Sequence, residues 1–372
     1  MSRLKTVILD TDDKDTDDKD TDDIDMVALS ATKTLDLTDL EKTVDLSEDD
    51  KTIDISTYQT SAPAKESDAV NLKRALTAAK LLGNVNEYTF VEELGSGATG
   101  DVFRAIRGVN ESFAIKRIKS RYIGTVEQEI NILKKLQPYC KPYLLCYHTH
   151  FIFDDHMYIV TEYLKDFTTL SDLIEKKNPA KNNPELVVKI IVNMIRGLRH
   201  LQKLFENSPV VHRDIKPHNL MVNTVTGDVK FIDFGFTCYG KECENIRKMR
   251  GTPFYMAPEL FRSRVLTMEY LVKTDIWAMA HTIINLCLGD NQLLVSLWLM
   301  TDGKKYEKSS GWTQMKAFAD YPFTNPKSQM YPYIDKINRT FVASANNILV
   351  KHGEKPINLF HMLNPTVRLR SY

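Results

Sequence analysis

The chain has 372 residues, 43% of them hydrophobic, and carries equal numbers of acidic and basic side chains, so it is long enough for two or more compact units. Its longest apolar runs, such as 186–198, are interrupted by polar residues and fall short of the roughly 20 that span a bilayer, which excludes a membrane protein. The apolar run at the start is too short for a signal peptide and the five cysteines are widely spread, so we expect an intracellular protein, cytoplasmic or nuclear, with reduced thiols.

The front of the chain is acidic. Residues 1–60 hold 18 acidic and 7 basic side chains, whereas the remainder holds 31 acidic and 42 basic ones. The five-residue repeats of 11–25 lack the apolar content needed to offset ordering entropy. An EF-hand is excluded because Asp18 replaces the turn glycine and Ile24 replaces the glutamate of the twelfth position. We therefore expect a disordered acidic tail over 1–65.

A second repeat, nine residues long, begins at Lys33. In one copy Val44 and Leu46 flank Asp45 and an acidic cluster follows, a pattern that resembles the short motifs that add a strand to ubiquitin-like modifiers. Residues 33–56 are thus a candidate binding segment for such a modifier. The simpler interpretation, an acidic tether, is favoured because the motif is short and degenerate.

The next stretch, 66–82, has a broad apolar face at helical spacing. Ser67 is suited to cap its start and Gly83 to close its end. We expect a helical lead-in over 66–87, followed by a globular domain over 88–372.

Within that domain, LGSGATGDV (94–102) contains GxGxxG between two β-rich stretches. Glycines in such a strand–turn–strand hairpin let backbone N–H groups approach nucleotide phosphates without hindrance from Cβ atoms. The following strand ends in Lys116, and a helical stretch after it carries Glu127 and Glu129.

At this point the chain resembles the eukaryotic-type protein kinase family, in which the third strand ends in the same A-I-K pattern. The resemblance implies that Lys116 contacts the α- and β-phosphates of ATP and that Glu129 holds this lysine in place. Glu127 is less suitable, because it lies two residues away and roughly 200° round the helix. Thr161 matches the gatekeeper position, and Thr169 and Asp172 are both candidates for a ribose contact. The implied nucleotide-binding residues are Leu94, Gly95, Gly97, Gly100, Val102, Ala114, Lys116, Glu162, Leu164 and Met221.

The most specific motifs are VVHRDIKPHNLM (210–221) and KFIDFG (230–235). By resemblance, Asp214 accepts or orients the proton of the substrate hydroxyl, and Lys216 stabilises charge on the γ-phosphate. Asn219 and Asp233 are the implied ligands of Mg²⁺, or of Mn²⁺ in its place. The HRDxKPxN form is typical of serine/threonine kinases rather than tyrosine kinases.

Residues 233–259, from DFG to APE, form the activation segment of this family. Thr252 is expected to brace Asp214 and Lys216. Between 240 and 251 there is no Ser or Thr to accept a regulatory phosphate, so we expect activity without phosphorylation of this segment. Glu242 or Glu244 could supply a fixed negative charge, although a solvated charged stretch is the simpler interpretation.

Two cysteines of the activation segment, Cys238 and Cys243, have four residues between them. This spacing could bind a metal or switch by oxidation, but no second pair accompanies it, so free thiols are expected.

Three further features complete the resemblance. Asp275 matches a buried anchor aspartate, and Arg368 is expected to pair with Glu259. The chain ends four residues after Arg368, so the usual last helix of the family is expected to be missing or replaced. The stretch 290–358 fits the family poorly and is interpreted as an insertion. Such a compact end would suit a large DNA virus, in which case the host cell is the location.

The sequence thus predicts an α+β, two-lobed protein kinase fold, with a β-rich lobe over 88–160 and a helical lobe over 165–372. The predicted function is transfer of the ATP γ-phosphate to serine or threonine hydroxyls of protein substrates. We expect neither nucleic acid nor a membrane as partner. The alternative is a pseudokinase scaffold, disfavoured because Lys116, Asp214, Asn219 and Asp233 are all retained.

Overall fold

The computed structural model describes residues 7–9, 84–97, 100–118, 123–206, 208–244, 249–262, 266–306 and 308–372. They fall into two compact units, a sheet unit ending at Phe167 and a helical unit beginning at Thr168 that also includes Val7–Leu9. This β-rich and helical composition agrees with the predicted α+β protein kinase fold. The acidic repeats, the candidate segment 33–56 and the predicted helix 66–82 lie outside the described residues.

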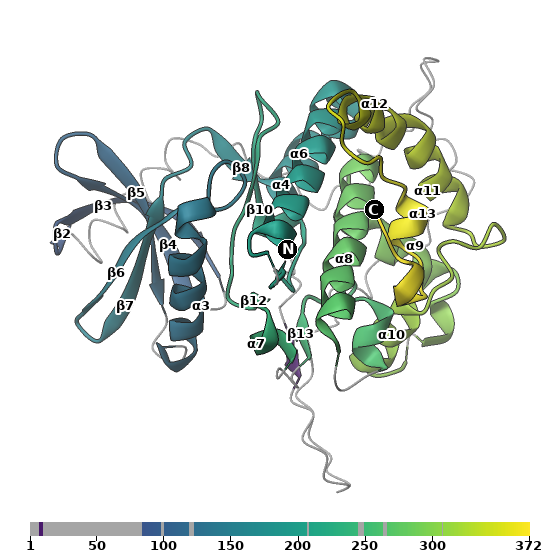
Figure 1. Cartoon of the computed structure of the whole chain (residues 1–372), viewed down its shortest axis with the longest axis horizontal. Coiled ribbons are helices and arrows are strands. Elements are labelled where there is room, and N and C mark those ends of the chain that lie inside the picture. Colours follow the sequence, from purple (N-terminus) through teal and green to yellow (C-terminus); the bar gives the residue numbers. More distant parts are fainter. Residues whose placement is uncertain are drawn as a thin grey trace, which may run out of the picture. The chain divides into compact units, whose positions relative to one another are not determined.

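An antiparallel sheet of six strands, in the order β2-β3-β4-β5-β7-β6, forms the sheet unit (Figure 1). Its elements are β2 (Asn84–Val85), β3 (Tyr88–Ser96), β4 (Gly100–Arg107), β5 (Glu111–Ile118), α3 (Ile123–Leu136), the 3₁₀ helix η4 (Gln137–Tyr139), β6 (Tyr147–Phe153) and β7 (His156–Glu162). Asn84 pairs with Thr89 across a turn in which Asn86 adopts a φ of 55°. The helical lead-in predicted over 66–87 is therefore wrong at its end, where the chain forms a hairpin that asparagine's tolerance of positive φ permits.

Side chains of β5 alternate between the two faces of the sheet. Phe113 and Ile115 are buried in an apolar cluster with residues of β3, β4 and β7. Ala114 and Lys116 therefore lie on the opposite face. Val102 is the cross-strand partner of Lys116 and shares that face. The two-residue period of the strand thus brings these three predicted nucleotide-binding side chains together.

Helix α8 (Met268–Leu288) is the centre of the helical unit. Nearly all its side chains from Leu271 to Cys287 are buried, which explains why its sequence is apolar on every side. Helix α6 (Pro184–Lys203) has one apolar face and packs against α8 (Figure 1). Among the described residues no single helix is long and apolar enough to span a membrane, although α8 and α9 (Leu293–Met300) together, bent by 93°, meet the criteria of length and composition.

Short strands and smaller helices surround these two. They are β1 (Val7–Leu9), β8 (Phe167–Thr169), α4 (Leu170–Lys177), α5 (Pro179–Asn182), β9 (Val210–Val211), η5 (Pro217–Asn219), β10 (Leu220–Asn223), β11 (Val229–Phe231), β12 (Cys238–Tyr239), α7 (Lys241–Glu244), β13 (Met249–Gly251), η6 (Pro258–Phe261), η7 (Lys304–Tyr306), α10 (Gly311–Ala319), α11 (Tyr331–Ile337), the π-helix η8 (Asn338–Val342), α12 (Ala343–Lys351), α13 (Leu359–Met362) and η9 (Val367–Leu369). Strand β9 pairs with β12, β10 pairs with β11, and β1 pairs with β13.

The stretch 290–358, which fits the family motifs poorly, supplies a large part of the helical unit. Helices α9 and α11 contact α8, and α12 contacts α6. Phe318 and Phe323 are each 1% exposed, so the stretch contributes to the core. At the end of the chain, Tyr372 donates a hydrogen bond to Gln202 of α6 at 2.5 Å.

A buried histidine in α8 gives this core a predicted response to pH. His281 is 2% exposed, and its ring centroid lies 5.2–5.5 Å from those of Trp277, Phe318 and Phe323. Burial lowers the pKa of His281 to about 3, and the positive charge of Arg370 adds to this. Between that value and about 6.5 the His281 ring binds a proton in the unfolded chain and not in the folded one, so the contribution of His281 to stability falls as the pH falls.

We expect the variant His281→Phe to lose less stability than the wild type between about pH 6.5 and pH 5, because Phe cannot take up the proton. Thermal unfolding followed by circular dichroism measures the two slopes. The same substitution at the exposed His361 serves as control and should leave the wild-type slope unchanged. Equal slopes for the wild type and His281→Phe would contradict the assignment.

Candidate active site

The loop between β9 and β10 gathers the predicted catalytic side chains of the helical unit. Lys216 Nζ lies 2.9 Å from Asp214 Oδ2 and donates to Thr252 Oγ1 at 2.5 Å. Thr252 Oγ1 in turn donates to Asp214 Oδ1 at 2.6 Å. Asn219 Nδ2 donates to both the backbone oxygen and Oδ2 of Asp214, each at 2.8 Å. Both carboxylate oxygens of Asp214 are therefore fixed in direction.

These groups are charged yet almost fully buried. Asp214 is 5% exposed and Lys216 is 7% exposed. Buried opposite charges need partners of good geometry, and here Thr252 and Asn219 provide the remaining hydrogen bonds. The arrangement is preorganised, so a hydroxyl group arriving at Asp214 meets an acceptor that does not have to move.

Asp275 of α8 holds the backbone of this loop from below. Its Oδ2 accepts from the His212 N–H at 2.7 Å and its Oδ1 accepts from the Arg213 N–H at 2.9 Å. Arg213 has a φ of 68°, a strained value for a long side chain, and the two bonds keep it there. Burial raises the pKa of Asp275 to about 7, which the two backbone donors oppose.

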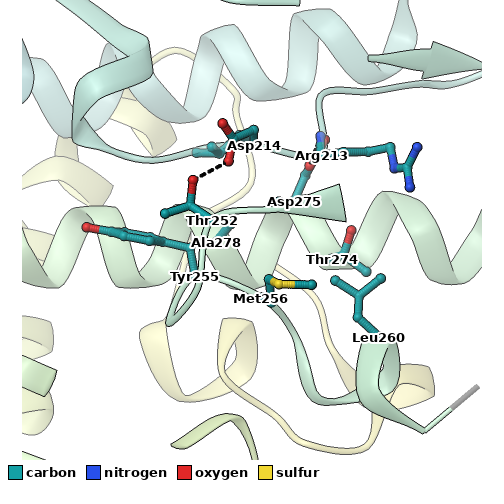
Figure 2. A pocket seen from close by; sticks show the side chains of 11 residues that line it. Arg213, Asp214, Thr252, Tyr255, Met256, Leu260, Thr274, Asp275 and Ala278 are labelled. Atoms are coloured by element: carbon teal, nitrogen blue, oxygen red, sulfur yellow. Dashed lines mark hydrogen bonds between the residues drawn. The ribbon is translucent and has the colours of Figure 1, made fainter. Parts of the chain in front are cut away.

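A small pocket lies beneath the loop, as Figure 2 shows. Its walls are side chains of the catalytic loop, of the segment from 251 to 260 and of α8. Thr252 points from its segment to Asp214 in this view. Tyr255 is anchored behind it, because its hydroxyl accepts from Asn285 Nδ2 at 2.8 Å. The segment that carries Thr252 is thus held by α8 as well as by the catalytic loop.

The residues predicted to hold a metal suit a hard cation. The Asn219 amide nitrogen is committed to Asp214, which leaves its carbonyl oxygen as the group for an ion. Asp233 is exposed, follows β11 and has a φ of 62°. One amide oxygen and one carboxylate are a typical protein share for Mg²⁺, which keeps phosphate and water oxygens as its other ligands. Among the described residues there is no cluster of three or more His, Cys, Asp or Glu side chains for a metal.

In the sheet unit, the strand lysine meets the predicted glutamate. Lys116 Nζ donates to Glu129 Oε1 at 2.9 Å and to Oε2 at 3.1 Å. Glu129, on α3, is 7% exposed, whereas Glu127 faces solvent. A rotation of roughly 200° round the helix thus separates the buried glutamate from the exposed one, as the helical geometry predicts.

The glycine-rich hairpin of the same unit is closed by a bond from the Gly97 N–H to the Gly100 oxygen at 2.8 Å. A Cβ at Gly100 would lie 2.4 Å from the Arg117 oxygen, so packing against β5 requires glycine there. At Gly95, by contrast, a Cβ would meet no atom within 4 Å. Leu94 beside it is 42% exposed.

The other predicted nucleotide-binding residues lie near the end of β7 and in β10. Glu162 accepts from the Cys146 N–H through its side chain at 2.9 Å, and Leu164 is half-buried. Met221 is half-buried in β10 of the helical unit. The two candidates for a ribose contact bind each other, since Thr169 Oγ1 donates to Asp172 Oδ2 at 2.9 Å and caps α4.

The ion pair predicted between Arg368 and Glu259 is wrong, because a different arginine makes it. Arg370 donates to Glu259 Oε1 at 2.5 Å and to Oε2 at 2.9 Å, and it is 1% exposed. Its guanidinium also lies 4.9 Å from the ring centroid of Trp277. The turn η9 directs Arg368 to the Tyr270 hydroxyl at the surface instead. The spacing of two residues between the arginines was the available signal, and sequence alone gave no reason to prefer the second.

The prediction that the cysteines are free thiols is wrong for four of them. Cys140 pairs with Cys146 in the sheet unit, and Cys238 pairs with Cys243 in the helical unit. Cys287 is a free, buried thiol, and burial raises its pKa. The sequence separations of 6 and 5 residues were visible, but the turns that bring the sulfur atoms together were not.

Comparison with known proteins agrees with this geometry. Residues 88–355 match the protein kinase domain. The chain belongs to the protein kinase family. Named relatives of this kinase include the serine/threonine-protein kinase CLA4 of Candida albicans, 30% identical over 234 residues that cover 61% of this chain and 23% of the relative. The serine/threonine-protein kinase shk2 of Schizosaccharomyces pombe is 30% identical over 245 residues, covering 61% of this chain and 39% of the relative.

The serine/threonine-protein kinase ppk5 of Schizosaccharomyces pombe is 34% identical over 211 residues, which cover 54% of this chain and 24% of the relative. The kinase described here therefore spans well under half of the length of the relatives that it matches.

Proposed function

We propose that this protein is a serine/threonine kinase that transfers the γ-phosphate of ATP to hydroxyl groups of protein substrates. The observation that carries the proposal is the hydrogen-bonded group of Asp214, Lys216, Thr252 and Asn219. Its chemistry suits phosphoryl transfer, which requires positioning and charge stabilisation more than covalent catalysis. The names of the relatives support serine and threonine as acceptors.

Each residue of this group has a separate task. Asp214 accepts a hydrogen bond from the substrate hydroxyl and aims its oxygen at the γ-phosphate. Lys216 Nζ lies 2.9 Å from that carboxylate, where its positive charge stabilises the negative charge that develops on the transferred phosphoryl group. Thr252 connects Asp214 and Lys216 to the activation segment through two hydrogen bonds. Displacement of the segment would therefore remove both bonds from this catalytic pair.

The proposed transfer also needs ATP and a divalent ion. Lys116 is the residue for the nucleotide phosphates, since both carboxylate oxygens of Glu129 accept from its ammonium group and set its direction. Asn219 and Asp233 would hold Mg²⁺ or Mn²⁺. When bound, that ion supplies neutralisation of phosphate charge.

We further infer that activity does not need phosphorylation of the activation segment. Thr237 is fully buried and its hydroxyl donates to the His212 oxygen at 3.4 Å. The ring of Tyr239 packs edge-on against Phe205 with centroids 5.7 Å apart. No other hydroxyl side chain lies between these residues and Gly251. Glu242 of this segment is exposed.

The second candidate function is a pseudokinase scaffold. Loss of the lysine, the catalytic aspartate or a metal ligand would favour it, and all of these residues are present with their bonds made. A protein partner is expected in either case, so binding alone does not separate the two functions.

The proposed acceptor specificity predicts that phosphate from γ-labelled ATP enters serine and threonine of a generic protein substrate, as the names of the relatives suggest. Acid hydrolysis followed by phosphoamino-acid separation measures this.

Independence from phosphorylation is tested by treating the proposed kinase itself with a phosphatase and then removing the phosphatase. The treated protein should keep its rate of phosphate transfer. Label in tyrosine alone would contradict the specificity, and a lost rate with phosphate mapped to 236–250 would contradict independence from phosphorylation.

A further inference from the structure

The first half of the activation segment is closed on itself by a covalent bond. A disulfide joins Cys238 of β12 to Cys243 of α7, with Cα atoms 5.3 Å apart. The two residues are 1% and 2% exposed. The turn between them passes through Gly240 at a φ of 52°, and the Cys243 N–H donates to the Gly240 oxygen at 3.1 Å. The disulfide therefore closes a compact turn, and a backbone hydrogen bond holds the same turn.

This turn is attached to the strand that leads into the catalytic loop. Cys238 pairs with Val211 across β12 and β9, and the next residue after Val211 is His212 of the HRD motif. Gly240 donates to the Pro209 oxygen at 3.3 Å. A Cβ at Gly240 would lie 2.9 Å from Ser208 Oγ, so the turn sits directly on the chain before β9.

The disulfide also lies in an apolar cluster with the start of α8. Both cysteines pack with Val211 and Leu271, and Met268 and Val272 cover the cluster. The sulfur atoms thus connect three pieces of the helical unit: β9, the activation segment and α8. The other fixed point of the segment is Thr252, which binds Asp214 and Lys216.

A phosphate is the usual means of fixing an activation segment, through new bonds to an arginine. Here the segment between Gly240 and Gly251 has no Ser or Thr, and the hydroxyl of Thr237 is buried. A thiol pair is present in the same stretch, at a separation and depth that let it form a cross-link.

We propose that Cys238 and Cys243 are an oxidative modification site whose disulfide fixes the activation segment on β9 and α8, in place of a phosphate. The cross-link holds the segment in the arrangement in which Thr252 reaches the catalytic pair. Reduction frees α7 from Cys238 and loosens that arrangement. The effect on catalysis rests on the proposed kinase function, whereas the cross-link and its effect on the segment do not.

The chemistry is thiol–disulfide exchange with a low-molecular-weight disulfide such as oxidised glutathione. The thiolate of one cysteine attacks a sulfur atom of that disulfide, forms a mixed disulfide and releases one small thiolate. The thiolate of the second cysteine then attacks the mixed disulfide, forms the Cys238–Cys243 bond and releases the second. Two cysteine thiols lose two electrons, the small disulfide is reduced to two thiols, and the two protons pass to the released thiolates.

The test equilibrates the full chain in mixtures of reduced and oxidised glutathione and then blocks free thiols with N-ethylmaleimide. Peptide mass mapping gives the fraction of the Cys238–Cys243 cross-link at each ratio. Phosphorylation of a generic protein substrate and hydrogen–deuterium exchange of the peptides over 236–256 are measured on the same samples.

We expect reduction to lower the rate about fivefold or more, at the same midpoint as the loss of the cross-link, and to speed exchange over 236–256. Cys238→Ala/Cys243→Ala should show the low rate and fast exchange at every ratio. Cys140→Ala/Cys146→Ala, which removes the other disulfide, should respond as the wild type does.

Two results would overturn the proposal: alkylation of both cysteines at every ratio, or a cross-link that forms without changing exchange over 236–256. A cross-link that slows exchange and leaves the rate unchanged would overturn the catalytic part. If neither form transfers phosphate while the cross-link still slows exchange, the proposed function fails and the oxidative site stands.

Discussion

The variant Asp214→Asn should transfer phosphate about 10²- to 10⁴-fold more slowly than the wild type, the range that a positioned acid or base contributes. The substitution keeps the size of the side chain, and an amide can still bind Thr252 and accept from Asn219. Its oxygen is a far weaker proton acceptor than a carboxylate. The fold should therefore remain while the chemistry is lost.

Initial rates with γ-labelled ATP and saturating protein substrate measure the effect. Asp155→Asn is the matched control, because Asp155 is exposed and lies in a hairpin of the sheet unit at a φ of 57° that Asn also tolerates. This control should keep the wild-type rate, and unchanged melting temperatures should show that both variants fold. Equal rates for Asp214→Asn and the wild type would remove Asp214 from the mechanism.

The second large effect concerns stability. Arg370→Ala should lower the free energy of unfolding by about 3–5 kcal/mol, because it leaves the buried carboxylate of Glu259 without its bidentate partner. The guanidinium also covers Trp277 and donates to the Lys273 and Asn364 backbone oxygens, so the packing on Trp277 and two further hydrogen bonds are lost. Denaturant unfolding measures the change.

Arg368→Ala is the control for this prediction. Its guanidinium donates to the Tyr270 hydroxyl at the exposed surface, and the substitution should cost about 0–1 kcal/mol. Both variants remove one arginine side chain, and the two positions are two residues apart. A difference between their unfolding free energies therefore reports the burial of Arg370 and not the loss of a charge. A larger loss of unfolding free energy for Arg368→Ala than for Arg370→Ala would support the pairing of Arg368 with Glu259 that the sequence predicted.

Three of the four residues in the catalytic group could be predicted from sequence because they lie close together in the chain and match one family motif. Asp214, Lys216 and Asn219 fall within six residues, and local backbone geometry brings them together. The pairing of Lys116 with Glu129 was implied by the family resemblance, and the helical period disfavoured Glu127.

The errors occurred where geometry depends on distant parts of the chain. Choosing Arg370 over Arg368 requires knowing that η9 turns one arginine outward and places the other over Trp277. Neither spacing nor charge distinguishes them. The disulfide of Cys238 likewise depends on the pairing of β12 with β9, two short strands with no signal of their own. The end of the predicted helical lead-in failed because Asn84–Val85 gains strand structure only by pairing with β3.

The central claim is that this protein performs phosphoryl transfer and does not merely bind nucleotide. The most direct test makes two measurements on the same preparation. Calorimetry measures binding of ATP with Mg²⁺, and a radiometric assay measures transfer of labelled phosphate to protein hydroxyls. We predict that both are seen and that Lys116→Met abolishes transfer, since it removes the cation that Glu129 holds. Nucleotide binding by the wild type with no transfer above the Asp214→Asn background would contradict the account and favour a scaffold.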